Sequence, residues 1–222
     1  MKNFTLLLIA VMLAALFGAC DDNVTQPSID DTATEMSFNR VSADEPGFSP
    51  ASSALKKGTD PIALIAINGG FDELVAALTY VDEQLSTGLV DMFLNGKDQY
   101  TVFAPTNAAF TNLYALLSTV LDTEIDEITD IPAEVVLDVL LYHVTDGRRA
   151  ANSVVPKNKE RQITSLLEEM FYVRTDGSIR DGLTGLRDDA TIDTPNISAS
   201  NGIIHVITQV IVPPSVVAAL TS

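Results

Sequence analysis

The sequence contains no tryptophan and a single cysteine, Cys20, among its 222 residues. One cysteine excludes an internal disulfide, and the lack of tryptophan leaves only tyrosine and phenylalanine to stack on sugars. Basic residues are scarce, because 13 Lys and Arg stand against 30 Asp and Glu and give a net charge of −17. So acidic a surface repels phosphate backbones and anionic lipid, and we expect no nucleic-acid partner and no membrane contact through a basic patch.

Long apolar runs are also missing, except at the start of the chain. Lys2 precedes an uncharged apolar run of 14 residues, 4–17, which ends at the small residues Gly18 and Ala19. These are the three parts of a secretory signal. The run is shorter than the ~20 residues that a bilayer-spanning helix needs. The sequence therefore predicts a signal peptide over residues 1–19 and an exported protein.

Cys20 follows the predicted signal directly. The sequence Phe17-Gly18-Ala19-Cys20 resembles the lipobox of bacterial lipoproteins, although leucine is more usual than Phe17 at that position. In that class the cysteine receives acyl chains and becomes the mature N-terminus, and several chains at ~0.8 kcal/mol per buried methylene make a durable anchor. The alternative is an ordinary signal, or an uncleaved anchor, with an accidental cysteine. We expect lipidation at Cys20 and a lipid-anchored protein that is surface-exposed or periplasmic.

Residues 21–59 are rich in Asp, Ser, Thr, Pro and Ala, and they show no lasting periodicity. Such a composition buries too little apolar surface to offset the entropy of ordering. As a random coil this segment has a mean span of about 35 Å. The sequence therefore predicts three parts: a lipoprotein signal peptide at 1–19, lipidated Cys20 with a flexible tether at 20–59, and a folded domain at 60–222.

The first half of the domain has helical patterns around one buried strand. Asp60-Pro61 is typical of a helix start, with an N-cap followed by proline. Apolar residues at helical spacing predict a second helix over residues 71–83. The β-branched and aromatic residues 101–103 favour a strand, which must stop at Pro105. Thr106 is placed to cap the next helix.

The second half changes from helical to extended patterns. Pro132 begins a helix whose apolar stripe directs His143 towards the core, and a short terminal helix is expected at 215–220. Short strands are predicted at 171–173, 178–179 and 190–192, and Asn201-Gly202 is a hairpin signal. The last strand, 203–212, is apolar on both faces and is therefore central. We expect it to pair with the strand at 101–103, in an α+β domain whose helices pack on a β-sandwich or wedge.

Three segments together resemble the motifs of fasciclin-type (FAS1) domains. They are TVFAPTNAAF at residues 101–110, LLYHV at 140–144 and NGIIHVI at 201–207, and they occur in the order found in that family. Asn107 departs from the aspartate common there, and Ala108 from a charged residue. The matching positions that we expect to be structural are Thr101, Val102, Phe103, Ala104, Pro105, Thr106, Phe110, Asn201, Gly202, His205 and Val206.

The resemblance implies an extracellular module used for adhesion to a protein or polysaccharide partner, without a cofactor and without catalysis. In some animal members integrin binding is assigned to the Tyr-His region, so the resemblance points to five candidate binding residues. These are Leu140, Leu141, Tyr142, His143 and Val144. The alternative interpretation is that Tyr142 and His143 serve folding alone.

Several polar groups carry a second interpretation. His143 and His205 fit either a metal or acid–base site or, as we favour, two hydrogen-bonded core histidines. Arg148 and Arg149 fit either a carboxylate or anionic-sugar contact or a solvated loop. An acidic cluster suits calcium but lacks the EF-hand pattern; its members are Asp181, Asp188, Asp189 and Asp193.

No motif for nucleophilic catalysis is present, since the sequence has no G-x-S-x-G and its cysteine lies at the predicted anchor. We therefore predict a lipid-anchored extracytoplasmic binding module. The alternative function is a periplasmic small-ligand carrier or enzyme that uses a pocket at the edge of the sandwich.

Overall fold

The computed structural model describes residues 56–220. The predicted signal peptide, Cys20 and the tether up to residue 55 lie outside the described residues. No helix in the described part of the chain combines the length and the apolar character needed to cross a membrane. The elements in chain order are α1 Ile62–Asn68, α2 Asp72–Leu85, α3 Leu89–Asn95, β1 Tyr100–Pro105, α4 Asn107–Leu121, the 3₁₀ helix η1 Ile128–Asp130, α5 Ala133–Tyr142, β2 Val144–Asp146, α6 Ala151–Val154, β3 Arg161–Thr164, β4 Met170–Val173, β5 Ser178–Arg180, β6 Ala190–Ser198, β7 Gly202–Ile207 and α7 Pro214–Leu220.

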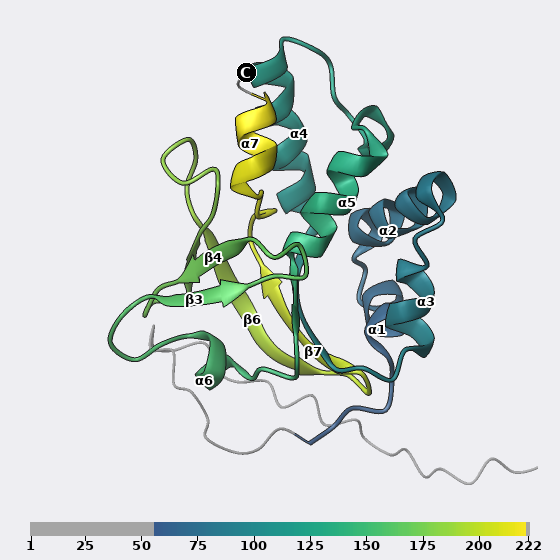
Figure 1. Cartoon of the computed structure of the whole chain (residues 1–222), viewed down its shortest axis with the longest axis vertical. Helices are drawn as coiled ribbons and strands as arrows, with labels where there is room; N and C mark the ends of the chain where they lie inside the picture. The colour runs from purple at the N-terminus through teal and green to yellow at the C-terminus, as the bar shows by residue number, and fades with distance from the viewer. Residues whose placement is uncertain (1–55, 221–222) are drawn as a thin grey trace, which may run out of the picture. The chain divides into compact units, whose positions relative to one another are not determined.

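The seven strands form one mixed sheet in the order β2-β1-β7-β6-β5-β4-β3. Only β1 and β7 run parallel, and in their register Val102 lies opposite Ile204. The predicted pairing of these two distant segments is confirmed. Figure 1 shows α1, α2 and α3 together beside this sheet, with α4, α5 and α7 above it and β3 and β4 in front of β6. The predicted α+β class is confirmed.

The sheet folds over on itself. Phe103 on β1 and Phe171 on β4 lie four strand steps apart in the sheet order, which is about 19 Å in a flat sheet. Their ring centroids are nevertheless only 5.0 Å apart, in an edge-to-face contact. The sheet therefore forms a wedge whose inner faces meet across aromatic rings.

The two ends of the folded sheet meet each other. The Thr145 hydroxyl on β2 donates to the carbonyl of Thr164 on β3 at 2.7 Å. Just beyond β3, the Leu166 backbone N–H donates to the carbonyl of Val144 at 2.8 Å. Edge strands with unpaired backbone groups invite pairing with other chains, and here each edge partly covers the other.

Two hydrophobic cores lie on opposite faces of the central strands. Val102 and Ala104 of β1 belong to the core between the sheet and the helices, together with Ile204 of β7. Phe103 and Ile207 belong to the core inside the wedge. A strand with apolar residues on both faces is thus covered on both sides, as the sequence predicted.

The predicted cap of α4 is confirmed, whereas that of α1 is wrong. The Thr106 hydroxyl accepts the backbone N–H of Ala109 at 3.3 Å. At α1 the capping position is Pro61 instead of Asp60, and Pro61 has no side-chain hydrogen bond. The backbone N–H of Ile62 instead donates to Oδ1 of Asn201 at 2.8 Å. A side chain far along the sequence therefore accepts a backbone hydrogen bond at the start of α1.

The final strand is shorter than predicted, because β7 ends at Ile207. The Thr208 backbone N–H still donates to the carbonyl of Thr191 on β6 at 3.0 Å. The buried residues 210–212 that follow bond mainly to side chains instead of a neighbouring strand. The Val210 carbonyl accepts from Arg187, and the backbone N–H groups of Ile211 and Val212 donate to His143 and Asp181. The sequence also gave no indication of α3, β2, α6 or β3, which are short or polar.

Candidate functional site

The Tyr-His pair joins the end of α5 to β2 and lies in the interior. Tyr142 is completely buried. Its hydroxyl donates to the carbonyl of Met170 at 2.9 Å, and its ring packs edge-on against Phe171 with centroids 5.5 Å apart. Burial is the main cause of a raised pKa for this hydroxyl. Tyr142 therefore stays neutral and connects α5 to the wedge core.

His143 is held in one tautomer by two backbone groups. Its Nδ1 lies 2.6 Å from the carbonyl of Val139, and its Nε2 lies 3.0 Å from the backbone N–H of Ile211. A carbonyl needs a donor and an N–H needs an acceptor, so Nδ1 carries the proton and Nε2 accepts. Burial lowers the pKa of His143 to about 4, with a smaller contribution from Arg187. The ring is neutral at pH 7 and has no free nitrogen.

His205 on β7 is held in the opposite tautomer. Its Nδ1 accepts the backbone N–H of Asn196 at 3.2 Å, and its Nε2 lies 2.9 Å from the carbonyl of Arg149, to which it donates. The ring is completely buried, and burial lowers its pKa. Both histidines are thus neutral core residues whose nitrogens are already in use.

Four of the five candidate binding residues are buried: Leu140, Tyr142, His143 and Val144, while Leu141 is half-buried. Leu140 and His143, however, line a cavity between the helices. Leu141, Tyr142 and Val144 do not line this cavity.

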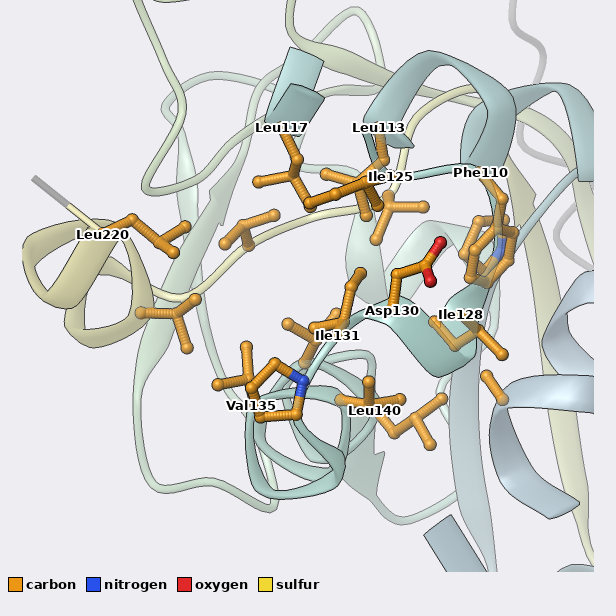
Figure 2. Close-up of a pocket in the computed structure, with 18 of the residues that line it drawn as sticks. Phe110, Leu113, Leu117, Ile125, Ile128, Asp130, Ile131, Val135, Leu140 and Leu220 are labelled. Carbon is orange, nitrogen blue, oxygen red and sulfur yellow. The ribbon is translucent and has the colours of Figure 1, made fainter. Parts of the chain in front are cut away.

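The cavity has a volume of about 150 Å³, and nearly all of its lining residues are apolar. Figure 2 shows its side chains converging from α4, η1, α5 and α7. It reaches the surface, since the lining residues Leu121, Asp130 and Pro132 are exposed. The full lining is Leu74, Ala77, Pro105, Phe110, Leu113, Leu117, Leu121, Ile125, Ile128, Asp130, Ile131, Pro132, Val135, Val136, Val139, Leu140, His143, Val210, Val212, Val216 and Leu220.

Asp130, the last residue of η1, supplies the only charged side chain of this lining. Figure 2 shows its carboxylate directed between Ile125 and Ile128. Its Oδ2 accepts the backbone N–H groups of Asp126 and Glu127 at 2.9 and 3.1 Å. These bonds lower the pKa of Asp130, so the carboxylate is ionised at pH 7.

The other polar groups singled out in the sequence are engaged in the fold. The guanidinium of Arg148 donates to the carbonyls of Ala199 and Gly202 and to the Ser198 hydroxyl, which secures the β6–β7 hairpin. Arg149 donates from Nε to the carbonyl of Asp146 at 3.0 Å.

Two of the four members of the acidic cluster are in ion pairs. Asp181 pairs with Arg187, and Asp189 pairs with Arg174. Within residues 56–220 no three His, Cys, Asp or Glu side chains gather closely enough to hold a metal ion.

The three family-motif segments occupy linked positions in this arrangement. Phe110 of the first motif lines the cavity, and His143 of the second forms part of its wall. In the third, Asn201 accepts from Ile62 at 2.8 Å and donates from Nδ2 to the carbonyl of Phe93 at 2.8 Å. Asn201 thus holds the start of α1 against the end of α3. No sequence pattern indicates this double role, and none indicates the part of Asp130 in the cavity.

The chain thus combines helices packed on a folded mixed sheet with two hydrogen-bonded core histidines and an apolar cavity. The fasciclin domain family model matches residues 69–213, and the chain belongs to this family. Fasciclin domains are in general non-catalytic binding modules.

Several proteins of known sequence are similar to the chain. Protein sll1483 of Synechocystis is 35% identical over 153 residues, which cover 69% of this chain and 73% of that protein. Immunogenic protein MPB70 of Mycobacterium bovis is 30% identical over 158 residues, 70% of each chain. The cell surface glycolipoprotein MPB83 of the same species is 27% identical over 161 residues, 70% of this chain and 62% of that protein.

A solved structure with this kind of domain is a FAS1 domain pair from the insect cell adhesion molecule fasciclin I. It aligns with a TM-score of 0.46 and 20% identity, over 66% of this chain and 46% of that one.

Proposed function

We propose that the protein is a lipid-anchored extracytoplasmic module that binds an extracellular protein or polysaccharide without catalysing a reaction. The observation that carries this proposal is the apolar cavity between α4, α5 and α7, which opens at the surface. A concave apolar site with one or two polar groups is the usual form of a binding pocket. Membership of the fasciclin family supports the same function.

The non-catalytic part of the proposal is supported by the state of the reactive side chains. His143 and His205 have both nitrogens hydrogen-bonded to backbone groups. The hydroxyl of Tyr142 donates to a carbonyl, and that of Tyr114 donates to Glu73 at 2.8 Å. A general acid or base must reach the substrate proton that it transfers, and these groups are occupied.

The anchoring part rests on Cys20 and on the similarity to a protein named as a cell surface glycolipoprotein. Fractionation of cells that produce the Cys20→Ala variant tests it. We expect the Cys20→Ala variant to leave the membrane fraction. The native chain and a Ser28→Ala control should remain in it. Membrane retention of Cys20→Ala equal to that of the native chain would contradict the anchor.

The binding part is tested with the released Cys20→Ala protein on arrays of extracellular proteins and glycans. We expect saturable binding to a member of one array, at a level that a large side chain placed in the cavity, as in Val139→Phe, reduces. If Val139→Phe leaves the binding unchanged, the partner binds at a surface other than the cavity.

A second candidate function is the carriage of a small apolar ligand, and the volume of the cavity favours it. The cavity lies between helices, not at the edge of the sandwich where the sequence suggested a pocket. Extraction of the purified protein with organic solvent, followed by mass spectrometry, tests this function. A stoichiometric apolar compound is the expected result for a carrier, and an empty extract contradicts it.

A further inference from the structure

The cavity has the size of a single apolar group. Its volume is about 150 Å³, and aliphatic residues and Phe110 supply most of its wall. Apolar cavities of about this size stay dry and accept a six-carbon ring. A sugar is a poor occupant, because its hydroxyls would lose their hydrogen bonds to water against such a wall. The occupant that fits is a large aliphatic or aromatic group.

The mouth of the cavity is negative. Asp130 is ionised and makes its hydrogen bonds through Oδ2, while no described group donates to its Oδ1. Tyr114 lies beside the same region, and the charges of Glu73, Asp130 and Glu127 add to burial in raising the pKa of its hydroxyl. The lining includes no lysine or arginine that would neutralise this charge. A cation beside the apolar group would therefore be attracted to the mouth.

We propose that the cavity binds a protein partner through one large apolar side chain that has a lysine or arginine next to it. The apolar side chain fills the space between α4, α5 and α7, and the cation pairs with the free Oδ1 of Asp130. The net charge of −17 also favours a basic partner segment over an acidic one. This inference rests on the proposed binding function and specifies its partner.

Two pairs of probes test the inference on the full Cys20→Ala chain in detergent-free buffer. The first pair is hexylammonium and hexanoate, and the second is acetyl-Leu-Lys-amide and acetyl-Leu-Glu-amide. Methyl NMR of the leucine, isoleucine and valine residues reports both the site and the dissociation constant. We expect the cationic probe of each pair to bind at least tenfold more tightly, with shifts at residues that line the cavity.

Variants separate the role of the charge from that of the cavity. Asp130→Asn keeps an acceptor for the two backbone N–H groups, and it should reduce the cationic preference to less than threefold. Asp126→Asn removes an exposed carboxylate four residues earlier and serves as its matched control. Val139→Phe and Val135→Phe fill the cavity from different positions on α5, and each should weaken both probes at least tenfold.

The outcomes that overturn the inference are distinct. Equal binding of hexanoate and hexylammonium would show that Asp130 does not select a cation. Undiminished binding of the probes in both Val139→Phe and Val135→Phe would show that they do not bind in the cavity. Competition by a neutral oligosaccharide for the same methyl groups would replace the protein partner with a polysaccharide. Failure of Cys20→Ala to leave the membrane contradicts the proposed anchoring alone, and the probe pairs are then measured on the same chain in lipid nanodiscs.

Discussion

The ring of His143 at the end of α5 accepts a hydrogen bond from the backbone N–H of Ile211, 68 positions later, at 3.0 Å. The same ring donates to the carbonyl of Val139 at 2.6 Å. One side chain thus connects the last turn of α5 to the segment that leads into α7. Both elements form walls of the cavity, so the histidine also fixes the distance between those walls.

Replacing His143 by alanine should lower the free energy of unfolding by about 1–3 kcal/mol, because buried backbone groups lose their partners. Urea denaturation followed by circular dichroism measures this change. Glu134→Ala, an exposed substitution on the same helix, is the control and should change stability by less than about 0.5 kcal/mol. A His143→Ala protein that unfolds like the native chain yet binds no partner would assign the residue to recognition.

Acidification should destabilise the protein through His143. Its pKa is about 4 in the folded state against an ordinary value of 6.5, so the unfolded chain takes up the proton first. The neutral His143 ring contributes about 3 kcal/mol to the free energy of unfolding. This contribution is complete above pH 6.5 and is lost as the pH falls to about 4. Urea unfolding at several pH values should show a shallower dependence in His143→Gln than in the native chain. Parallel curves would contradict a neutral buried ring.

Asn201 should be sensitive to both of its hydrogen bonds. Asn201→Ala leaves the N–H of Ile62 and the carbonyl of Phe93 without partners, and we expect a loss of about 2–4 kcal/mol. Asn201→Asp keeps an acceptor for Ile62 but turns a carboxylate towards a carbonyl, so it should destabilise at least as much. Thermal unfolding compares both with Asn112→Ala, an exposed substitution on α4. A neutral Asn201→Asp would show that the bond to Phe93 contributes nothing.

Gly202 should tolerate no side chain. A Cβ at this position would lie 2.2 Å from the carbonyl oxygen of Tyr100 and 2.7 Å from the side chain of Ile62. We expect Gly202→Ala to cost about 3 kcal/mol through overpacking between β1 and β7. Ser200→Ala in the same turn is the control, with an effect within about 0.5 kcal/mol. Equal denaturation midpoints for the two variants would contradict the close approach.

The two ion pairs of the acidic cluster should differ in their contribution. The side chain of Asp181 is 0% exposed, whereas that of Arg174 in the other pair is 40% exposed. Arg187→Met leaves a buried carboxylate without its cation and should cost about 3 kcal/mol at pH 7. Arg174→Met, the matched control, should cost less than about 1 kcal/mol.

The pH dependence of the Arg187→Met deficit follows from the pKa of Asp181. Burial raises this pKa, and Arg187 opposes the effect. Without Arg187 the folded-state pKa rises further, so the carboxyl is neutral in the folded protein at low pH. The deficit should therefore shrink as the pH falls from 7 to 4. A deficit that is constant over this range would contradict a buried, uncompensated charge.

Sequence patterns predict those elements in which the residues themselves favour the structure that the packing requires. The apolar runs of β1 and β7 specify strands covered on both faces, and their pairing with Val102 opposite Ile204 follows. By contrast, the polar residues of β3 carry no strand signal, and its pairing with β4 makes it a strand. The pair Asn201-Gly202 predicts a hairpin turn, but the backbone φ of Gly202 is not positive. Glycine is needed at this position because the Tyr100 carbonyl lies so close.

The cavity could not be predicted from the sequence. Phe110, Leu113 and Val136 lie on apolar helix faces, and such faces normally pack without a gap. Only the packing of α4, α5 and α7 shows that their side chains leave space between them. The part of Asp130 in the cavity could not be predicted either. Asp130 follows four other acidic residues in the sequence, and nothing in this pattern distinguishes it from them.

The contact between β2 and β3 also bears on crowding. Chains confined to a membrane surface meet one another at far higher local concentration than chains in solution, and sheet edges then become sites of fibre growth. In this domain Thr145 and Leu166 use their donors to join the two outermost strands. The contact between β2 and β3 therefore leaves fewer open backbone groups with which a strand of a neighbouring molecule could pair.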